Sequence, residues 1–531
     1  MTHTIAPRLT RRLAVGVVAL ALLTPLAVQA QPVTVGRLVA IGGGTEDPAL
    51  LKEVLALAKG EASRVAILNT ASSDPDRSGP AYQRFFQSLG VKEAMLVPLL
   101  GREQAYQPAV LDAIGRADLI YVTGGNQIRL AQAVHDTPAH GALLAAFQRG
   151  AVIAGTSAGA MVWGPRYLAA GTSDGALKGQ DLDMRPGLGL VPQLVLDTHF
   201  AREARLGRLL VATSQSPGTL GVGVDERTAA VITAEGVRVL GHGRVTVLDL
   251  KEAKLPPKPA ATFSIRDVRM HLLGGSDSLR FRREASERQP MLPPRSREAA
   301  ELPSLWLQGS AAPSAAIGLL TSRTGRLPEE VLILAGSGAT EAAQGWRQSL
   351  MGRGALNVRV LAAHQLTGNM LSRYLTTPSG LLMVDDADRS LGKALMGAPG
   401  QQLRSHVAKL PLGVAGEAVA IPGETSMKPG AGSPELLPGL RLAPGLVTTP
   451  NVWAPDAFDR LVLDSLLAGG ALGVGLSPDN ALRLEAGRLK AEGASPVFLV
   501  DTDTVSLANP SMPSARDLTL QVLAPGEEMP F

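Results

Sequence analysis

Ala151-Val-Ile-Ala-Gly-Thr-Ser-Ala-Gly-Ala160 is the stretch of this chain that decides its fold. A short apolar run stops at Gly155, Ser157 stands between two glycines, and a helix-compatible stretch follows. This pattern is typical of a strand that turns sharply into a helix, lifts a serine hydroxyl clear of the sheet and aims backbone N–H groups at the same point. A short G-x-S-x-G match also fits an ordinary Gly-Ser turn, so the rest of the sequence must decide between the two.

Further apolar runs in the first half of the chain end in glycine or polar residues and alternate with helix-like stretches such as 50–58 and 82–89. This alternation predicts an α/β fold: a flavodoxin-like, doubly wound, mostly parallel sheet with its functional side chains after the carboxyl ends of strands. The runs are Arg37 to Gly44, Arg64 to Leu68, Ala117 to Val122 and Ala151 to Ala154.

Composition restricts the classes of protein to consider. A length of 531 residues exceeds one ordinary core and favours two domains. The chain is 45% hydrophobic and 18% charged, as expected for a globular protein, and a formal charge of only +4 argues against a nucleic acid partner. The sequence contains no cysteine, which excludes thiol nucleophiles, disulfides and thiolate metal sites.

The first thirty residues have the features of a secretory signal. Three arginines precede an apolar run from Leu13 to Val28, and Val28-Gln29-Ala30 offers a small-residue cleavage site. We therefore expect a secreted or periplasmic protein that begins at Gln31 and has no membrane contact in its mature form. An N-terminal membrane anchor is the alternative, and Thr10-Arg11-Arg12-Leu13 leaves twin-arginine export open.

Two parts of the chain resemble each other. Residues 186–226 align without gaps onto 438–478 at an offset of 252, and two earlier strand-like runs (38–44 with 304–310, 65–68 with 331–334) align at an offset of 266. We predict a duplicated fold: a catalytic domain at 31–281, an Arg/Pro-rich linker at 282–303 and a second copy at 304–531. For the linker, a polyanion-binding patch is the alternative interpretation.

A serine hydroxyl is a weak nucleophile until a histidine removes its proton and a carboxylate orients that histidine. His199 follows the apolar run Leu194-Val-Leu-Asp-Thr198 and is the best-placed histidine for Ser157. Glu226 ends another strand-like run and is the favoured acid, with Asp225 and Asp197 as competitors.

Several motifs in the same order resemble the S51 family of serine peptidases, the group of cyanophycinases and aspartyl dipeptidases, over roughly residues 33 to 280. The resemblance implies a flavodoxin-like sheet related to class I glutamine amidotransferases, with Ser157 as nucleophile, His199 as base and Glu226 as orienting acid. It also implies that Gln127, Asp197, Arg205 and Arg208 line the substrate pocket. The motifs are Gly155-Thr-Ser-Ala-Gly-Ala160, Gly124-Gly-Asn-Gln127, Asp197-x-His-Phe200 with Arg205 and Arg208, and Asp225-Glu226.

By this resemblance the substrate is a peptide or an arginyl-polyaspartate polymer, hydrolysed without metal or cofactor while the N–H groups of Gly125 and Ala158 hold the oxyanion. Arginine forks can hold a carboxylate bidentately, and Asp197 can pair with a cationic group. The chain departs from the polymer-degrading members at Thr198, where they carry Gln, and at Ala131, where they carry Lys. An aspartyl dipeptidase and a non-catalytic peptide or polymer binder remain the alternatives.

The second copy lacks the chemistry of the first. At the offset of 252, His199 corresponds to Asn451 and Glu226 to Pro478, while Ser157 falls opposite Gly416. These residues cannot act as base, acid or nucleophile. We therefore expect a non-catalytic second copy that packs on the first as an intramolecular pseudo-dimer.

Overall fold

The computed structural model describes most of the chain after the predicted signal segment. Within the described residues the strands form three eight-stranded sheets and two small two-stranded sheets. The segments 1–30 and 282–303, interpreted above as signal and linker, lie outside the described residues. The structure describes residues 36–180, 182–255, 262–281, 304–310, 312–313, 328–376, 378–407, 410–423, 425–427, 436–502 and 514–531.

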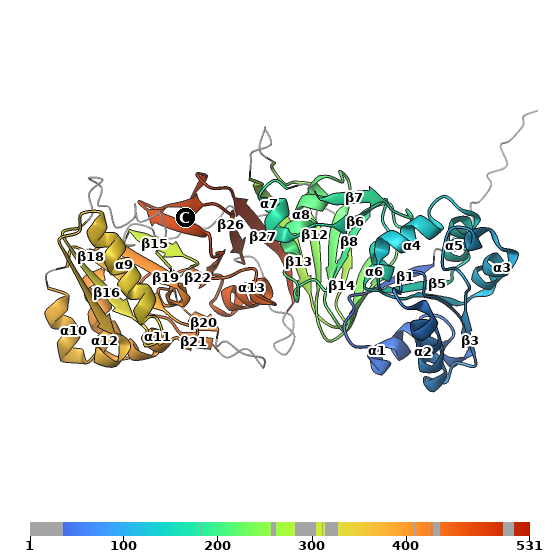
Figure 1. Ribbon diagram of the computed structural model, residues 1–531, viewed down its shortest axis with the longest axis horizontal. Helices are drawn as coiled ribbons and strands as arrows, with labels where there is room; N and C mark the ends of the chain where they lie inside the picture. The colour runs from blue at the N-terminus through green and yellow to red at the C-terminus, as the bar shows by residue number, and fades with distance from the viewer. Residues whose placement is uncertain are drawn as a thin grey trace, which may run out of the picture. The chain divides into compact units, whose positions relative to one another are not determined.

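The first sheet has five parallel strands in the order β3-β2-β4-β5-β1, continued past β1 by three antiparallel strands (Figure 1). When β2 is numbered as the first strand, β3-β2-β4-β5 has the 2-1-3-4 order of a flavodoxin-like sheet. β1 occupies the position of the fifth strand. The predicted α/β, doubly wound fold is confirmed. The strands are β1 (Arg37–Ile41), β2 (Arg64–Leu68), β3 (Glu93–Leu96), β4 (Leu119–Val122), β5 (Val152–Thr156), β10 (Thr228–Ile232), β11 (Gly236–Gly241) and β14 (Ser278–Arg280).

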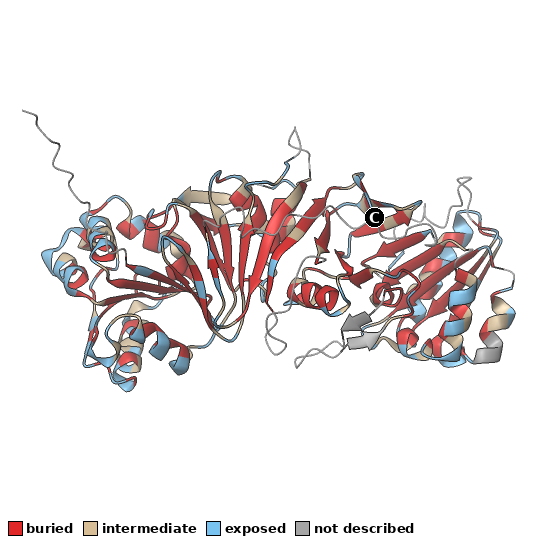
Figure 2. Cartoon of the chain, turned by 180° about the vertical axis from the view of Figure 1, so that it is seen from behind, coloured by how far each residue is buried: buried red, intermediate tan, exposed pale blue. Residues whose placement is uncertain are grey.

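Helices cover both faces of this sheet because alternate strand residues point to opposite sides. Val39, Val65 and Val152 pack with α1 and α2, whereas Leu38 and Ile153 pack with α3, α4 and α5. Figure 2 shows the strands between these helices as mostly buried. The helices are α1 (Pro48–Ala56), α2 (Pro75–Ser88), α3 (Pro108–Arg116), α4 (Gln127–Val134) and α5 (Pro138–Gln148).

Local sequence sets where several helices begin. The carboxylate of Asp47 accepts hydrogen bonds from the N–H groups of Ala49 and Leu50, and Pro48 opens α1. Thr137 accepts from the N–H of His140 in the same way before Pro138 opens α5. A polar cap followed by proline satisfies helix N–H groups and supplies a pre-set φ angle.

The second sheet contains strands from both halves of the chain in the order β8-β9-β12-β13-β27-β26-β23-β22. Its two central strands, one from each half, pair antiparallel, and each half contributes four strands. The strands are β8 (Leu194–Thr198), β9 (Leu220–Val224), β12 (Val245–Asp249), β13 (Ile265–Leu273), β22 (Leu446–Thr449), β23 (Leu472–Gly475), β26 (Val497–Asp501) and β27 (Ala515–Leu523).

The third sheet repeats the order of the first with equivalent strands: β17-β16-β18-β19-β15-β24-β25-β28. The described part of the chain is therefore duplicated in topology, as the alignment predicted. The strands are β15 (Leu305–Gln308), β16 (Glu330–Ala335), β17 (Asn357–Ala362), β18 (Gly380–Asp385), β19 (Leu412–Gly416), β24 (Asn480–Glu485), β25 (Arg488–Gly493) and β28 (Glu528–Pro530).

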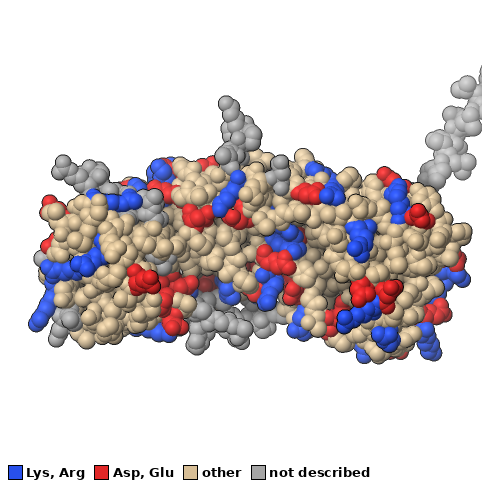
Figure 3. Space-filling model, viewed as in Figure 1, with Lys and Arg blue, Asp and Glu red and all other residues tan. Residues whose placement is uncertain are grey.

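Shorter elements connect and cover these sheets. Figure 3 shows basic and acidic side chains interspersed on the face in view. Among the described residues, no helix combines the length and apolar character needed to span a bilayer. The remaining elements are β6 (Arg166–Ala170) with β7 (Asp183–Pro186), β20 (Thr425–Met427) with β21 (Leu436–Pro438), α6 (Ala158–Met161), α7 (Ser173–Leu177), α8 (Leu206–Ser214), α9 (Thr340–Gly352), α10 (Gly368–Tyr374), α11 (Ser390–Ala394), α12 (Ala398–Val407) and α13 (Ala457–Leu467).

The ungapped alignment at the start of the second copy was wrong by one residue. Leu38 pairs with Ile232, and Leu305 pairs with Leu484, the equivalent of Ile232 at the offset of 252. Leu305, and not Ser304, is therefore the equivalent of Leu38, and the offset in this strand is 267. A strand buried on both faces has no polar alternation to fix its register, so the sequence pattern tolerates the slip.

Candidate active site

Ser157 stands at a strained turn between β5 and α6. Its backbone angles are φ 52° and ψ −124°, a conformation that costs a non-glycine residue about 1–3 kcal/mol. Its N–H donates to the carbonyl of Ile41 at 2.9 Å, which fastens the turn to β1. The flanking glycines allow close packing, because a Cβ on Gly155 would lie 2.3 Å from the carbonyl oxygen of Gly159. The predicted strand-to-helix elbow is present.

His199 follows β8 and reaches Ser157 from the second sheet. The distance between its Nε2 and the Ser157 Oγ is 2.8 Å, although 42 residues separate the two along the chain. Its backbone also has a positive φ, 49°, and its N–H donates to the carbonyl of Gly42 at 2.8 Å. The side chain is 21% exposed. The imidazole is thus held at the nucleophile from both sheets and remains accessible.

Glu226 is the carboxylate that contacts the imidazole. Its Oε1 lies 2.7 Å from the Nδ1 of His199. Asp225 turns the other way and accepts from the N–H groups of Ala201 and Arg244, each at 3.0 Å. Of the three acids considered from the sequence, only Glu226 lies against the histidine; Asp197 is engaged elsewhere, as described below.

The glycines that follow β1 form a cradle for the histidine and the glutamate. A Cβ on Gly43, whose φ is +91°, would lie 2.3 Å from the His199 Cε1, and one on Gly44 would lie 3.1 Å from the Glu226 Cβ. Sequence reasoning used Gly42-Gly-Gly44 only as the end of a strand and missed this contact. Three successive glycines after a strand are a signal of close approach.

A second glycine loop, after β4, lies against the nucleophile. A Cβ on Gly124 would be 3.2 Å from the Cβ of Ser157. Gly125 has a φ of +139°, and a Cβ there would lie 2.1 Å from the carbonyl oxygen of Ala71, so only glycine fits. Ala158 opens α6, where N–H groups have no partner within the helix. Both predicted oxyanion donors therefore belong to segments that border Ser157.

Asp197, Arg205 and Arg208 form one buried cluster. Asp197 is fully buried, and Arg208 donates to its two oxygens at 2.7 and 2.6 Å, while Arg205 donates at 3.1 Å. The side chains of Arg205 and Arg208 are 17% and 12% exposed. Contrary to the expectation that it faces a cationic substrate group, Asp197 lies behind the arginines as their counter-ion.

Gln127 occupies the first position of α4, where its amide nitrogen donates to the carbonyls of Leu168 and Ala169 at 3.2 and 2.9 Å. These bonds tie α4 to β6. Its amide donors thus already serve the fold, a use that the sequence did not reveal.

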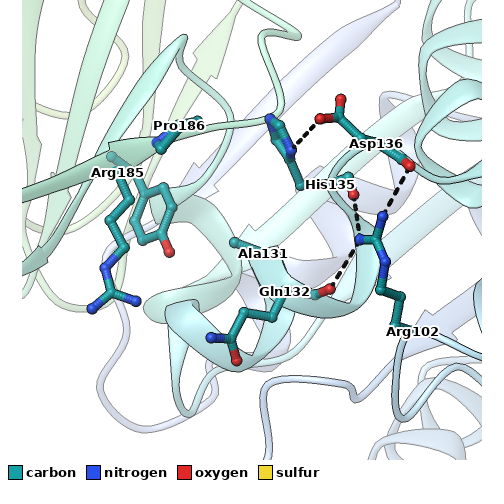
Figure 4. Close-up of a pocket in the computed structure, with 8 residues that line it drawn as sticks. Arg102, Ala131, Gln132, His135, Asp136, Arg185 and Pro186 are labelled. Carbon is teal, nitrogen blue, oxygen red and sulfur yellow. Dashed lines mark hydrogen bonds and ion pairs between the residues drawn. The ribbon is translucent and has the colours of Figure 1, made fainter.

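A pocket of about 310 Å³ lies at the far end of the same helix (Figure 4). Ala131 is among its lining residues, so no amine projects into it from that position. Arg102 donates to the backbone carbonyls of His135 and Asp136 at 2.7 and 3.2 Å and thereby caps the helix end. Ala131 lies four residues after Gln127 on α4, a rise of about 6 Å along the helix.

The equivalent positions in the second copy keep the backbone but not the side chains. Gly416 ends β19 with φ 63° and ψ −143°, close to the angles of Ser157. Asn451 follows β22 and accepts from the N–H of Trp453 at 3.1 Å, and Pro478 follows β23.

Among the described residues, no group of three His, Asp or Glu side chains could hold a metal ion.

Comparison with known proteins identifies the family. The model of peptidase family S51 matches residues 38–240. The cyanophycinase of Synechococcus elongatus is 34% identical over 269 residues, which are 49% of this chain and 83% of that protein. The cyanophycinase of Geminocystis herdmanii is 34% identical over 259 residues, 47% of this chain and 94% of that protein. The crystal structure of a peptidase from an acI-B1 Actinobacterium aligns with a TM-score of 0.35 at 23% identity, covering 47% of this chain and 99% of that one.

This chain belongs to peptidase family S51 and is a serine-type peptidase of the cyanophycinase type.

Proposed function

We propose that Ser157 is the nucleophile of this peptidase, His199 its general base and Glu226 the carboxylate that orients the imidazole. The single observation that carries this proposal is the pair of contacts at 2.8 and 2.7 Å that link the three side chains. With Nδ1–H donating to Glu226, Nε2 is free of a proton and can accept one from the serine hydroxyl.

The reaction is an acyl transfer. The Ser157 oxygen attacks the carbonyl carbon of an amide while His199 takes the hydroxyl proton, and the N–H groups of Gly125 and Ala158 hold the oxyanion. His199 then gives that proton to the leaving amine, and an acyl-enzyme remains. Water attacks the ester, His199 takes its proton and returns it to the Ser157 oxygen, and the acid is released. This chemistry uses only side chains and backbone of the first copy.

The proposed substrate is a β-aspartyl-arginine polymer or a related peptide, cleaved from an end. Arg205 and Arg208 support it as positive charges that attract a substrate carboxylate. Their N–H groups already donate to Asp197, to Glu203 and to the carbonyls of Thr198 and Gly171, which holds both guanidinium groups in place. Asp197 fixes the geometry of both forks from behind, and Gln127 supports the adjoining wall. Thr198 and Ala131, which replace Gln and Lys of polymer-degrading members, favour an aspartyl dipeptide as the second candidate.

One assay distinguishes these substrates. The mature protein, its Ser157→Ala variant and a Ser88→Ala control are incubated with arginyl-polyaspartate granules and, separately, with aspartyl dipeptides. Ser88 is exposed on α2, so its loss leaves the site untouched. Dipeptide release from granules by the parent and the control, but not by Ser157→Ala, is the expected result. Release that persists without the Ser157 hydroxyl would overturn the assignment, and lack of covalent labelling by a fluorophosphonate would favour a non-catalytic binder.

We further propose that residues 1–30 direct export to the periplasm or the exterior, that 31–281 form the catalytic domain, that 282–303 link the copies and that 304–531 form a non-catalytic partner domain. The antiparallel pairing of β13 with β27 supports an intramolecular pseudo-dimer, because it covers an edge that the first copy alone would expose. Peptide is the proposed partner, with neither nucleic acid nor membrane bound by the mature form. Producing residues 31–281 alone tests the pseudo-dimer: a stable, fully active monomer would refute it.

A further inference from the structure

The second copy contacts the segment that directly follows the catalytic histidine. The N–H of Asp456, just before α13, donates to the carbonyl of Ala201 at 3.0 Å. The N–H of Ala201 donates in turn to Asp225 at 3.0 Å. Ala201 stands two residues after His199, and its carbonyl also accepts from the N–H of Ala204 in the first copy at 3.2 Å. The segment that carries His199 is therefore in contact with both halves of the chain.

Beneath this contact two carboxyl groups from different copies meet an arginine. Asp225 accepts from the N–H of Arg244 at 3.0 Å, and the Nη1 of Arg244 lies 3.6 Å from an oxygen of Asp459, which is 6% exposed. Burial, with the charge of Asp459, raises the pKa of Asp225 to about 8, and burial also raises the pKa of Asp459. The pair thus holds a proton at neutral pH and interacts as one unit with Arg244.

Other charged groups near the pair are Asp456 and Arg460, which flank Asp459 on its own segment and act on it with opposite signs. Glu226 adjoins Asp225 in the chain but turns to His199. At neutral pH the cluster therefore contains one protonated carboxyl, one carboxylate and the Arg244 guanidinium. Loss of the proton places a second negative charge in a site built for one, and like charges in a buried site repel strongly.

The cluster exists at only one of the two equivalent places in the duplicated fold. At the offset of 252, Asp225 corresponds to Ser477, Arg244 to Pro496 and Asp459 to Gly207. A contact that served packing alone could occur at both places. The carboxyl pair and the arginine occur only beside the copy that carries the serine, histidine and glutamate. This placement links the cluster to the proposed active site.

We propose that the second copy is a positioning element for the catalytic histidine, and that Asp459 and Asp456 hold the His199–Ala201 segment in the active arrangement up to an alkaline limit. The proposal rests on the proposed function of Ser157 and His199. Above that limit the doubly ionised pair separates, α13 withdraws from Ala201, and His199 shifts from the serine. A shift of about 1 Å at a catalytic group can cost about 100-fold in rate.

The pH profile of turnover tests this, together with the rate at which a fluorophosphonate labels Ser157 in the full-length mature chain. Protonation of a catalytic imidazole lowers activity on the acid side of a profile, whereas this cluster acts on the alkaline side. We expect both rates to fall by about 10-fold or more between pH 7 and 9.5. Asp459→Asn, which keeps the shape of the side chain and removes the like charge, abolishes that fall.

Asp517→Asn is the matched control. Asp517 is also a buried carboxylate of the second copy that pairs across to the first, with Arg269 at 2.8 Å. It lies on β27 in the centre of the second sheet, and three strands separate β27 from β8. Its variant keeps the alkaline fall of the parent. An Asp459→Asn profile that matches the parent's, or a parent with no alkaline fall, overturns the proposal. Absence of labelling at every pH would overturn the proposed function as well.

A second pair of variants tests the backbone bond separately. Asp456 has a φ of 58°, which glycine adopts freely and a β-branched residue resists. Asp456→Gly retains the hydrogen bond from this N–H to the carbonyl of Ala201, and we expect near-normal turnover. Asp456→Val reorients the N–H and breaks that bond, so we expect a lower kcat with little change in KM. Equal activities for these two variants, each folded by circular dichroism, would contradict the positioning role.

Discussion

Gly43→Ala offers the sharpest test of how the active site is built. The added Cβ would lie 2.3 Å from the Cε1 and 2.5 Å from the Nε2 of His199, whereas ordinary contact begins at 3.4 Å. The imidazole must therefore move by about 1 Å, since Gly43 is fixed by the bond from the N–H of Arg227 to its carbonyl. Such a displacement lengthens the contact with Ser157 beyond hydrogen-bond distance, and we expect kcat/KM to fall by about 100-fold.

Gly218→Ala provides the control, because Gly218 also has a positive φ, +81°, but a Cβ there meets nothing within 4 Å. Both substitutions carry the backbone cost of about 1–2 kcal/mol, and only Gly43→Ala collides with the histidine. We would measure kcat/KM, fluorophosphonate labelling and thermal unfolding of both variants. Comparable unfolding with a selective loss of turnover in Gly43→Ala is the expected result. Equal turnover of the two variants would refute the cradle.

Three further predictions concern the nucleophile, its acid and a surface ion pair. Glu226→Gln leaves the fold intact but lowers kcat by about 100- to 10,000-fold, because the amide no longer fixes the imidazole tautomer; steady-state kinetics check this, and a loss below 10-fold would contradict it. Ser157→Gly and Ser157→Ala both abolish turnover, yet the glycine variant is more stable by about 1 kcal/mol, since alanine retains the strained φ; urea unfolding compares them, and equal stability would contradict the strain argument. Hydrogen bonds from Arg64, followed by Lys59, hold the pKa of Asp118 below its usual range, so this carboxylate stabilises the fold fully above about pH 4, and the contribution is lost gradually as the pH falls from there through the lowered pKa. Asp118→Asn therefore costs about 1 kcal/mol at pH 7, limited by solvent screening, and progressively less as the pH falls below 4 towards the lowered pKa; unchanged urea midpoints at pH 7 would contradict this.

The sequence contained enough to predict which side chains meet. Ser157, His199 and Glu226 each follow an apolar run, as functional side chains after strand ends do. The sequence did not reveal that these strands belong to two sheets, β5 to the first and β8 and β9 to the second. The duplicated order of strands was also predictable, because the glycines and apolar residues that shape a sheet recur at fixed offsets.

The contacts that could not be predicted from the sequence are those between segments far apart in the chain. The burial of Asp197 beneath Arg205 and Arg208 follows from how β8 and α8 pack, and a carboxylate beside two arginines reads equally well as a substrate ligand. The contact of Gly43 with His199 joins residues 156 positions apart. The one-residue slip at β15 arose because a fully buried strand offers no polar face to fix its register.

The turn at Ser157 and its counterpart at Gly416 show how function and strain are connected in this fold. Both residues end a central parallel strand and adopt nearly the same positive φ, 52° and 63°. In the first copy a serine bears the cost of that conformation, because its hydroxyl has to stand clear of the sheet beside the histidine. In the second copy the histidine position is Asn451, so a hydroxyl at this turn would have no base. Glycine then keeps the turn that the sheet requires and removes the strain. The backbone conformation therefore belongs to the fold, and the strained side chain belongs to the chemistry.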